Sequence, residues 1–319
     1  MSGRAPEVDL WGLLNGALTT RALGLVVELR IPDALAQGPR PVADLAPEAG
    51  ADTETLYRLL RALASEGVFA EEEPGVFRNT AASETLMRGG GVAEFALLFG
   101  GIWHQAVGEI QADGAQPAFE RIHGTDWWSW LAEHPAERAI FDSAMAEGKG
   151  RRADRLEAVE WRGDETVVDV GGGNGSLLVT LLERRPGLRG IVFDLPETVR
   201  DEEALGERIE FVEGSFFDFV PEGDVYVLGT VLHDWDDESA ARILRTIRAS
   251  APAGSRLLIL DAVLPPGNEP NGTKWLDVLM LALVGGKERN EAQWRELLAA
   301  GGFEPVRFHE ALIEAVPAD

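Results

Sequence analysis

The run Thr166-Val-Val-Asp-Val-Gly-Gly-Gly-Asn-Gly-Ser176 is the most informative part of this chain. Its first five residues predict a short buried strand that carries one acid. Gly171, Gly173 and Gly175 end that strand, and residues 177–182 predict a helix. A glycine-rich turn between a strand and a helix lets a ligand approach bare backbone, and the helix N-terminus favours an anionic group.

The spacing of the glycines indicates which nucleoside cofactor this turn suits. A dinucleotide-binding turn has the form G-x-G-x-x-G, whereas this one has G-x-G-x-G and places Ser176 at the sixth position. That form suits S-adenosylmethionine, whose anionic group is a small carboxylate rather than a pyrophosphate. A generic glycine loop is the alternative at this point.

An acid at the end of the next strand supports a nucleoside cofactor. Residues 190–194 predict a second strand that closes at Asp194. An acid about 20 residues after the glycine turn is placed to accept hydrogen bonds from ribose hydroxyls. The other interpretation of Asp194 is a helix N-cap before Pro196.

Length and composition restrict the class of protein. The 319 residues suffice for two domains with sizeable cores. Cysteine is absent, which excludes disulfides and thiolate sites and fits a cytoplasmic enzyme. No apolar run approaches the ~18 residues of a membrane span, and Met1–Asp9 lacks the pattern of a secretory signal. We therefore expect no membrane partner.

The N-terminal part resembles a DNA-binding shape but has the wrong charge. A capped amphipathic helix at 52–63 is followed by two short strands within 67–78, which is a winged-helix pattern. With 54 acids, 29 bases and a net charge of −25, the chain cannot readily neutralise phosphates, and residues 71–73 place three glutamates on the wing. We therefore expect a dimerisation module and no nucleic-acid partner.

From about Gly163 onward the pattern alternates strand and helix. Such alternation predicts an α/β fold with a doubly wound, Rossmann-like sheet, whose ligands lie beyond the carboxyl ends of the strands. The expected domains are 1–155, mainly helical and dimerising, and 156–319, which binds the cofactor. The predicted strands cover 166–170, 190–194, 208–212, 224–229, 255–261, 303–309 and 311–316.

Aromatic residues are concentrated between residues 92 and 148, just before the predicted cofactor domain. A buried core explains most of them, but such a concentration also suits the wall of an aromatic substrate pocket. The rings are Phe95, Phe99, Trp103, Phe119, Trp127, Trp128, Trp130 and Phe141.

His233 is the candidate general base. It follows the fourth predicted strand and precedes a helix whose first turn carries acids at 236–238. Its unperturbed pKa of about 6.5 suits proton transfer, although a structural histidine is the alternative. The three acids are interpreted as partners of the helix dipole, and a metal site is the minority interpretation, so we expect no metal.

Two acids are candidates for orienting that base. Glu288 follows an apolar helix at 275–284 that breaks at Gly285, and Asp277 lies on the helix itself. A buried carboxylate here would accept the Nδ1 proton of the histidine and hold its tautomer. The alternatives are surface charge or a local ion pair with Arg289.

At this point the chain resembles the small-molecule O-methyltransferases of the acetylserotonin and caffeic acid type, in particular the bacterial natural-product branch. The resemblance extends from about residue 10 to residue 315, and Leu-His-Asp-Trp at 232–235 with Gly-Gly-Lys-Glu-Arg at 285–289 carries it most specifically. Further matching segments are 23–46, 56–63, 119–126, 141–145, 171–175, 191–196, 213–217, 231–238 and 285–294.

The resemblance implies a role for each candidate residue. His233 would be the base, oriented by Glu288 and Asp277. The acceptor pocket would be lined by Trp103, Phe141 and Met145. Two positions depart from the family pattern, which usually has Asp at Ser215 and Arg or Lys at Thr230. The positions implied to bind S-adenosyl-L-methionine are Gly171, Gly173, Gly175, Asp194, Ser215, Phe216 and Thr230.

The sequence thus predicts a homodimeric, metal-independent O-methyltransferase acting on a phenolic or enolic small molecule. The alternative within the same fold is a non-methylating hydroxylase or cyclase that uses bound S-adenosylmethionine passively. The presence of both His233 and Glu288 favours methylation. A winged-helix regulator is the rival from another class, and the net charge of −25 opposes it.

Overall fold

The computed structural model describes residues 8–112, 114, 116–147, 149–196, 198, 206–309 and 311–318. The chain forms two compact units that meet between Gly108 and Glu109. The helices between Ala118 and Leu156 belong to the second unit, which also holds the large sheet. The predicted functional division at residue 155 concerns which part lines the acceptor pocket, and it stays a prediction.

The first unit is the predicted helical module with a small sheet. Its strands are β1 (Arg40–Pro41), β2 (Phe69–Glu73) and β3 (Val76–Asn79), antiparallel in the order β1-β3-β2. The predicted hairpin is therefore confirmed, and β1 is an additional strand. The helices are α1 (Leu10–Glu28), α2 (Ile31–Ala34), α3 (Val42–Glu48), α4 (Thr53–Ser65), α5 (Ala81–Glu84), α6 (Ala93–Gly100) and α7 (Ile102–Gly108).

Helix α4 shows why these residues form a module. Asp52 caps its N-terminus by accepting a hydrogen bond from the Thr55 backbone N–H at 2.8 Å. Leu56, Leu60 and Leu63 recur at helical spacing and are buried in the core of this unit. The predicted capped amphipathic helix is confirmed.

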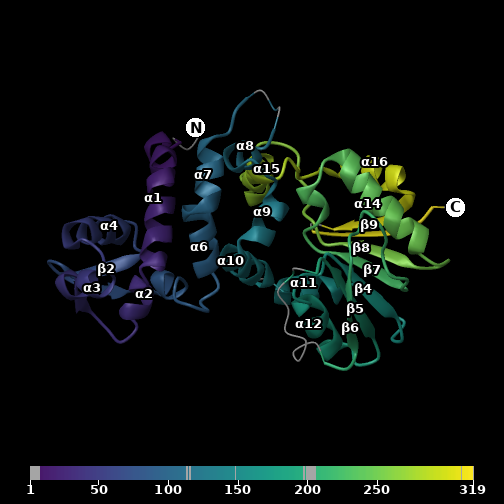
Figure 1. Cartoon of the computed structure of the whole chain (residues 1–319), viewed down its shortest axis with the longest axis horizontal. Helices are drawn as coiled ribbons and strands as arrows, with labels where there is room; N and C mark the ends of the chain where they lie inside the picture. Colours follow the sequence, from purple (N-terminus) through teal and green to yellow (C-terminus); the bar gives the residue numbers. More distant parts are fainter. Residues whose placement is uncertain are drawn as a thin grey trace, which may run out of the picture. The chain divides into compact units, whose positions relative to one another are not determined.

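Helix α1 is buried only near its C-terminal end, at Ala22, Gly24 and Val26, and is mostly exposed over its N-terminal half. Near its C-terminal end it packs against α6 so closely that a Cβ on Gly24 would lie 2.8 Å from the Gly100 Cα (Figure 1). Its N-terminal half leaves Trp11, Leu14 and Leu18 at least 68% exposed. By length and composition alone α1 could also cross a membrane, with a mean hydropathy of 1.3. No membrane span was expected from the sequence, because polar residues interrupt the apolar residues of this segment.

The second unit is built on a seven-stranded sheet in the order β6-β5-β4-β7-β8-β10-β9. Strands β6, β5, β4, β7 and β8 are parallel, and β10 is antiparallel to both of its neighbours. The predicted α/β sheet is confirmed. Its strands are β4 (Thr166–Val170), β5 (Arg189–Asp194), β6 (Ile209–Glu213), β7 (Val225–Leu228), β8 (Arg256–Ile259), β9 (Phe303–His309) and β10 (Leu312–Pro317).

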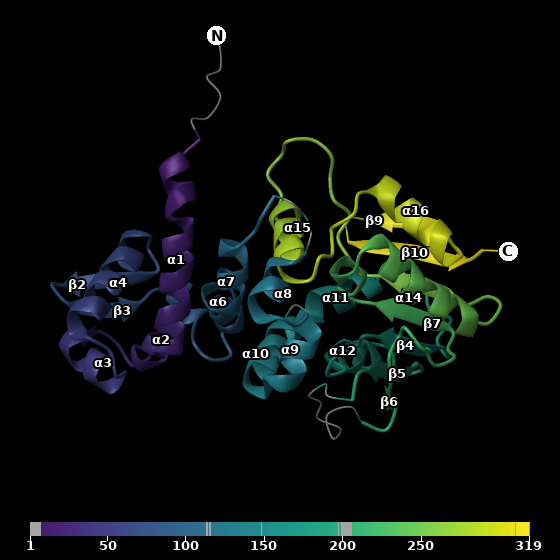
Figure 2. The ribbon, with the colours of Figure 1, turned by 45° about the horizontal axis from the view of Figure 1, so that its top comes forward.

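Helices cover both faces of this sheet (Figures 1 and 2). Alternate residues of β4 and β7 face α14 and α16 on one side and α11 and α12 on the other. The helices of this unit are α8 (Ala118–His123), α9 (Trp127–Glu133), α10 (Pro135–Ala146), α11 (Lys149–Leu156), α12 (Ser176–Arg184), the 3₁₀ turn η1 (Leu232–Asp234), α14 (Asp237–Ser250), α15 (Gly272–Leu283) and α16 (Glu291–Gly301).

The strand order fixes where a ligand binds. From β4 the chain moves outward to β5 and β6, then returns to place β7 on the other side of β4. In open α/β sheets the crevice at such a reversal, beyond the carboxyl ends of the strands, holds the ligand. The glycine turn after β4 and the histidine after β7 both lie at this place.

Candidate active site

The glycine turn (residues 171–175) has the backbone that its sequence predicts. Gly171, Gly173 and Gly175 have φ angles of +70°, +58° and +78°, a region that side chains disfavour. A Cβ on Gly172 would lie 2.7 Å from the Asp169 Cγ. Helix α12 begins immediately afterwards at Ser176, whose N–H donates to the Asn174 Oδ1 at 3.1 Å, so the helix N-terminus lies beside the glycine turn.

Asp194 lies at the carboxyl end of β5 and binds this turn directly. Its Oδ2 accepts a hydrogen bond from the Gly173 N–H at 2.7 Å. Its Oδ1 accepts from the Leu195 N–H and from the Thr198 hydroxyl, both at 2.7 Å. The side chain is only partly buried, so it holds the turn and still faces outward.

The predicted adenine-side residues follow β6. The Ser215 hydroxyl accepts a hydrogen bond from the Phe217 N–H at 3.2 Å. The Phe216 ring lies against the glycine turn, since a Cβ on Gly171 would be 3.7 Å from its Cε1. Thr230, after β7, has a φ of +59°, which is unusual for a β-branched residue.

These groups fit the amino-acid end of S-adenosylmethionine. Asp169 is 2% exposed, and its Oδ2 has no hydrogen-bond partner within the described part of the chain. Burial raises its pKa to about 7, while the positive charge of Arg152 opposes this. An unpartnered carboxylate beside a helix N-terminus suits a ligand that carries both an ammonium and a carboxylate group.

This buried acid makes stability depend on pH. Because the folded pKa of Asp169 is raised from 3.8 to about 7, its ionised form destabilises the fold above pH 7, and the penalty diminishes as the pH falls toward 3.8. We expect Asp169→Asn to raise the melting temperature at pH 8. The gain in the free energy of unfolding should be smaller at pH 5.5 than at pH 8, by roughly 1–2 kcal/mol.

Thermal unfolding at both pH values measures this effect. Asp218→Asn makes the same chemical change at an exposed acid and should leave the melting temperature unchanged. A gain for Asp169→Asn that is equal at pH 5.5 and pH 8 would contradict the assignment.

The predicted base and its orienting acid are in direct contact. His233 lies in η1 between β7 and α14, and its Nδ1 is 2.6 Å from the Glu288 Oε1. His233 is 9% exposed and Glu288 is 3% exposed. The hydrogen bond uses Nδ1, which leaves Nε2 as the nitrogen that can exchange a proton with a ligand.

Negative charge surrounds this histidine. Burial alone would lower its pKa, but the Asp234 charge and the hydrogen bond to Glu288 outweigh burial and raise the pKa to about 10. The Nε2 atom is 3.5 Å from the Asp234 Oδ1. Burial also raises the pKa of Asp234 to about 7, against the opposing charge of His233. The site therefore stabilises an imidazolium.

Asp277 is linked to the histidine through Glu288. Its Oδ1 accepts a hydrogen bond from the Glu288 backbone N–H at 2.8 Å. It therefore supports the segment that carries Glu288.

The predicted pocket residues lie in both units. Trp103 is buried in the first unit and packs edge-on against Phe99, with ring centroids 5.0 Å apart. Phe141 is in the second unit and packs against Trp127 at 5.5 Å. Met145 is partly buried one turn further along the same helix, α10.

Three buried residues of this site were not among the predicted site residues: Asp169, described above, Asp261 and Arg289. Asp261 is 1% exposed and its Oδ2 accepts a hydrogen bond from the Leu232 N–H at 3.2 Å. It follows β8, so the strand-end rule that singled out Asp194 would have found it. Arg289 is fully buried; it belongs to the segment 285–289 that carries the resemblance, but neither charge nor periodicity distinguishes it from a surface arginine.

A glycine turn and a strand-end acid at the ligand-binding edge of a doubly wound sheet are typical of a nucleoside-cofactor enzyme, and the buried pair of His233 and Glu288 lies at the same edge. The O-methyltransferase domain matches residues 103–304, and the O-methyltransferase dimerisation domain matches residues 11–89. The chain belongs to the O-methyltransferase family. The predicted resemblance is confirmed.

Three relatives illustrate the family. The phenazine O-methyltransferase PhzM of Lysobacter antibioticus is 36% identical, over 99% of each chain. The O-methyltransferase NcsB1 from neocarzinostatin biosynthesis, solved with S-adenosyl-L-homocysteine and 1,4-dihydroxy-2-naphthoic acid, is 32% identical at a TM-score of 0.80, over 98% of this chain and 100% of that one. Human N-acetylserotonin methyltransferase, solved with S-adenosylmethionine, is 26% identical at a TM-score of 0.86, over 100% of both chains.

Proposed function

We propose that this chain transfers a methyl group from S-adenosylmethionine to a hydroxyl of an aromatic, polyketide-like small molecule. The observation that carries the proposal is the 2.6 Å contact between the His233 Nδ1 and Glu288, placed beyond the same sheet edge as the glycine turn. The relatives named above act on or bind aromatic compounds, which supports a phenolic or enolic acceptor.

Several residues would hold the cofactor. The glycine turn and the α12 N-terminus would receive its amino-acid end, with Asp169 facing an ammonium. Asp194 would bind the ribose hydroxyls, and Phe216 would pack on the adenine beside Ser215. Thr230 lies at the same edge, after β7. When bound, the cofactor supplies an electrophilic methyl group on a sulfonium.

The protein's own task is to handle the acceptor proton. A phenol has a pKa of about 10, so at neutral pH its oxygen is a weak nucleophile. His233 would take this proton on Nε2, and Glu288 would stabilise the imidazolium through Nδ1. Such assistance accelerates a reaction roughly 10²–10⁴-fold. The raised pKa of His233 shows that the surrounding carboxylates favour the imidazolium, which is the form that this proton transfer produces.

His233 must be neutral when the acceptor arrives. In the free chain its raised pKa favours the charged form at neutral pH. A positive charge held next to the imidazole disfavours the imidazolium, because like charges repel. A bound cationic cofactor would therefore prepare the base, and this supports the order in which cofactor binds before acceptor.

The function is tested by product formation. The chain is incubated with S-adenosylmethionine carrying a labelled methyl group and a set of hydroxylated naphthoates, phenazines and simple phenols, and products are read by mass spectrometry. Label on an acceptor oxygen supports the proposal. Binding of the cofactor with oxidised or cyclised products and no labelled acceptor would instead identify the non-methylating alternative.

We also propose a homodimer formed through the first unit. The N-terminal half of α1 has a stripe of large apolar side chains that are exposed in the single chain. The match to the O-methyltransferase dimerisation domain includes this region. Obligate interfaces bury roughly 2,000 Å² or more. Light scattering at micromolar concentration should therefore report twice the mass of one chain.

Substitution of the stripe tests that proposal. Leu14→Asp with Leu18→Asp should give monomers, because both side chains are exposed in the single chain and charge would be buried in the dimer. Arg58→Ala on α4 is the control, at an exposed position that is not apolar. A monomeric wild type would refute the dimer.

The proposed cytoplasmic location has its own test. Recovery of the protein with the membrane fraction would refute it.

A further inference from the structure

The segment 285–289 packs against and hydrogen-bonds to the backbone that carries His233. We call residues 232–235 the histidine turn. A Cβ on Gly286 would lie 2.1 Å from the His233 carbonyl oxygen, so the two backbones are in direct contact. Glu288 and Arg289 are consecutive, yet Glu288 reaches the histidine ring whereas Arg289 reaches the backbone of the turn. Adjacent side chains on extended backbone point to opposite sides, which permits this division.

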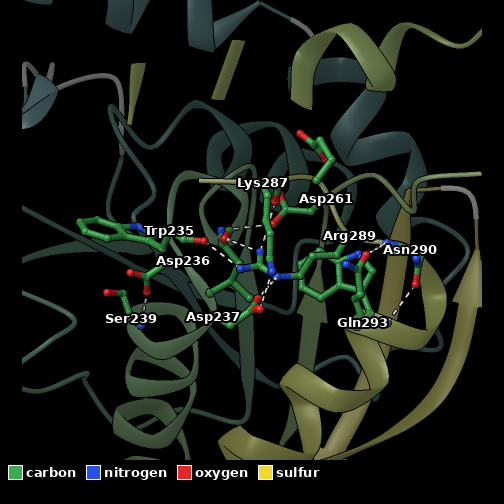
Figure 3. Close-up of polar contacts among 12 residues, drawn as sticks. Trp235, Asp236, Asp237, Ser239, Asp261, Lys287, Arg289, Asn290 and Gln293 are labelled. Carbon is green, nitrogen blue, oxygen red and sulfur yellow. Dashed lines mark hydrogen bonds and ion pairs between the residues drawn. The ribbon is translucent and has the colours of Figure 1, made fainter. Parts of the chain in front are cut away.

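Arg289 binds both ends of the histidine turn, and Figure 3 draws it together with Trp235 and Asp237. Its Nη1 donates to the Leu232 carbonyl oxygen and its Nη2 to the Trp235 carbonyl oxygen, each at 2.8 Å. Its Nε donates to the Asp237 Oδ1 at 2.9 Å. The two carbonyls flank the residues that carry the reactive groups, so one guanidinium spans His233 and Asp234.

The guanidinium is enclosed as well as hydrogen-bonded. Arg289 is 0% exposed, and its Cζ lies 5.5 Å from the centre of the Trp294 ring. The planar guanidinium fork of arginine presents its N–H donors in fixed directions, so it binds several acceptors with little loss of conformational entropy. The ammonium group of lysine is a single point charge and cannot do this. The position of the Arg289 side chain is therefore fixed, and its hydrogen bonds to the Leu232 and Trp235 carbonyls hold the histidine turn in place.

We propose that Arg289 is a positioning residue for proton transfer: by holding the Leu232 and Trp235 carbonyls it sets where the His233 ring lies relative to the acceptor. This inference rests on the proposed function of His233 as the base. It assigns to Arg289 no contact with acceptor or cofactor. Misplacement of a catalytic group by about 1 Å can lower a rate by about 10²-fold.

Arg289→Lys tests the proposal because it keeps the charge and loses the fork. We expect kcat to fall 10- to 100-fold with a weakly acidic phenol, while the dissociation constant of S-adenosyl-L-homocysteine stays within about twofold. With a strongly acidic phenol, which ionises unaided, the loss should shrink to a few-fold. A purely structural role would reduce all acceptors equally and weaken cofactor binding.

Lys287→Met is the matched control. Lys287 also binds Asp237, but none of its side-chain contacts reaches the histidine turn within the described residues. Its substitution should leave kcat unchanged for both phenols. If Arg289→Lys fails to fold, Asp237→Ala removes the Nε contact at a carboxylate that is 58% exposed. It should then show a several-fold loss with the same dependence on acceptor acidity.

Parallel measurement of His233→Ala separates the two proposals. If its defect does not depend on acceptor acidity, the base assignment fails, and this inference fails with it. If His233→Ala shows the dependence but Arg289→Lys, or Asp237→Ala in its place, loses activity uniformly or not at all, Arg289 does not position the base. A dependence shared by both variants supports the inference.

Discussion

Replacing His233 with alanine is expected to lower kcat by roughly 10²–10⁴-fold while cofactor affinity changes little. The ring is buried against Glu288, and its Nε2 is the proposed proton acceptor, so removal of the ring should deprive a neutral phenol of its base. The loss should shrink as the pKa of the acceptor falls or as the pH rises toward 10, since the oxygen then ionises unaided. Initial rates with phenols of graded acidity, from pH 7 to pH 9.5, measure this.

Glu288→Gln is the companion variant for this prediction. The amide can still accept from Nδ1 but carries no charge to stabilise the imidazolium, so its cost should be smaller than that of His233→Ala. The pH dependence of kcat should shift toward neutrality, because removal of the carboxylate lowers the pKa of His233. A His233→Ala defect of equal size for strongly and weakly acidic phenols would leave the histidine with a structural role only.

Asp194→Ala is expected to weaken S-adenosylmethionine binding by roughly 10- to 100-fold, the range for losing charge-assisted hydrogen bonds. The substitution removes the proposed hydrogen-bond acceptor for the ribose hydroxyls, and it also removes the acceptor of the 2.7 Å hydrogen bond from the Gly173 N–H. Both effects act on the same ligand, so the dissociation constant should change far more than kcat at saturating cofactor. Titration calorimetry measures it for S-adenosylmethionine and for S-adenosyl-L-homocysteine.

Two controls define this result. Asp194→Asn keeps one oxygen for the Gly173 N–H and should lose less affinity than the alanine variant. Glu213→Gln changes a charged residue at the end of the neighbouring strand and should leave affinity close to that of the wild type. Unchanged affinity in Asp194→Ala would remove Asp194 from the cofactor site.

The sheet was predictable because its residues carry a local signal. Apolar runs such as 166–170 are bounded by glycine or by an acid. A strand of a parallel sheet is buried on both faces, so its sequence is a nearly continuous apolar run. Strand β1 was missed because two residues, Arg40 and Pro41, show no periodicity. The acids at 236–238 were correctly placed at a helix start, where Asp236 caps α14.

The site was predictable in type but only partly in geometry. Strand ends singled out Asp194 and His233, since topology brings the ends of parallel strands to one edge. From the sequence, Arg289 was part of the matching segment 285–289 and an alternative ion-pair partner for Glu288 or Asp277, with no role of its own in the site. In the structure Glu288 reaches His233 and Arg289 reaches the turn, because neighbouring side chains face opposite ways. Such directions depend on tertiary packing, which a single sequence does not record.

The contact between Gly286 and His233 bears on how this enzyme can acquire new acceptors during evolution. Any side chain at position 286 would collide with the backbone at His233, and that backbone cannot move aside without displacing the proposed base. Selection for a new acceptor must therefore spare this segment and act elsewhere. The aromatic helices α9 and α10 lie outside that constraint, so their side chains can vary while the proton-transfer apparatus is inherited intact.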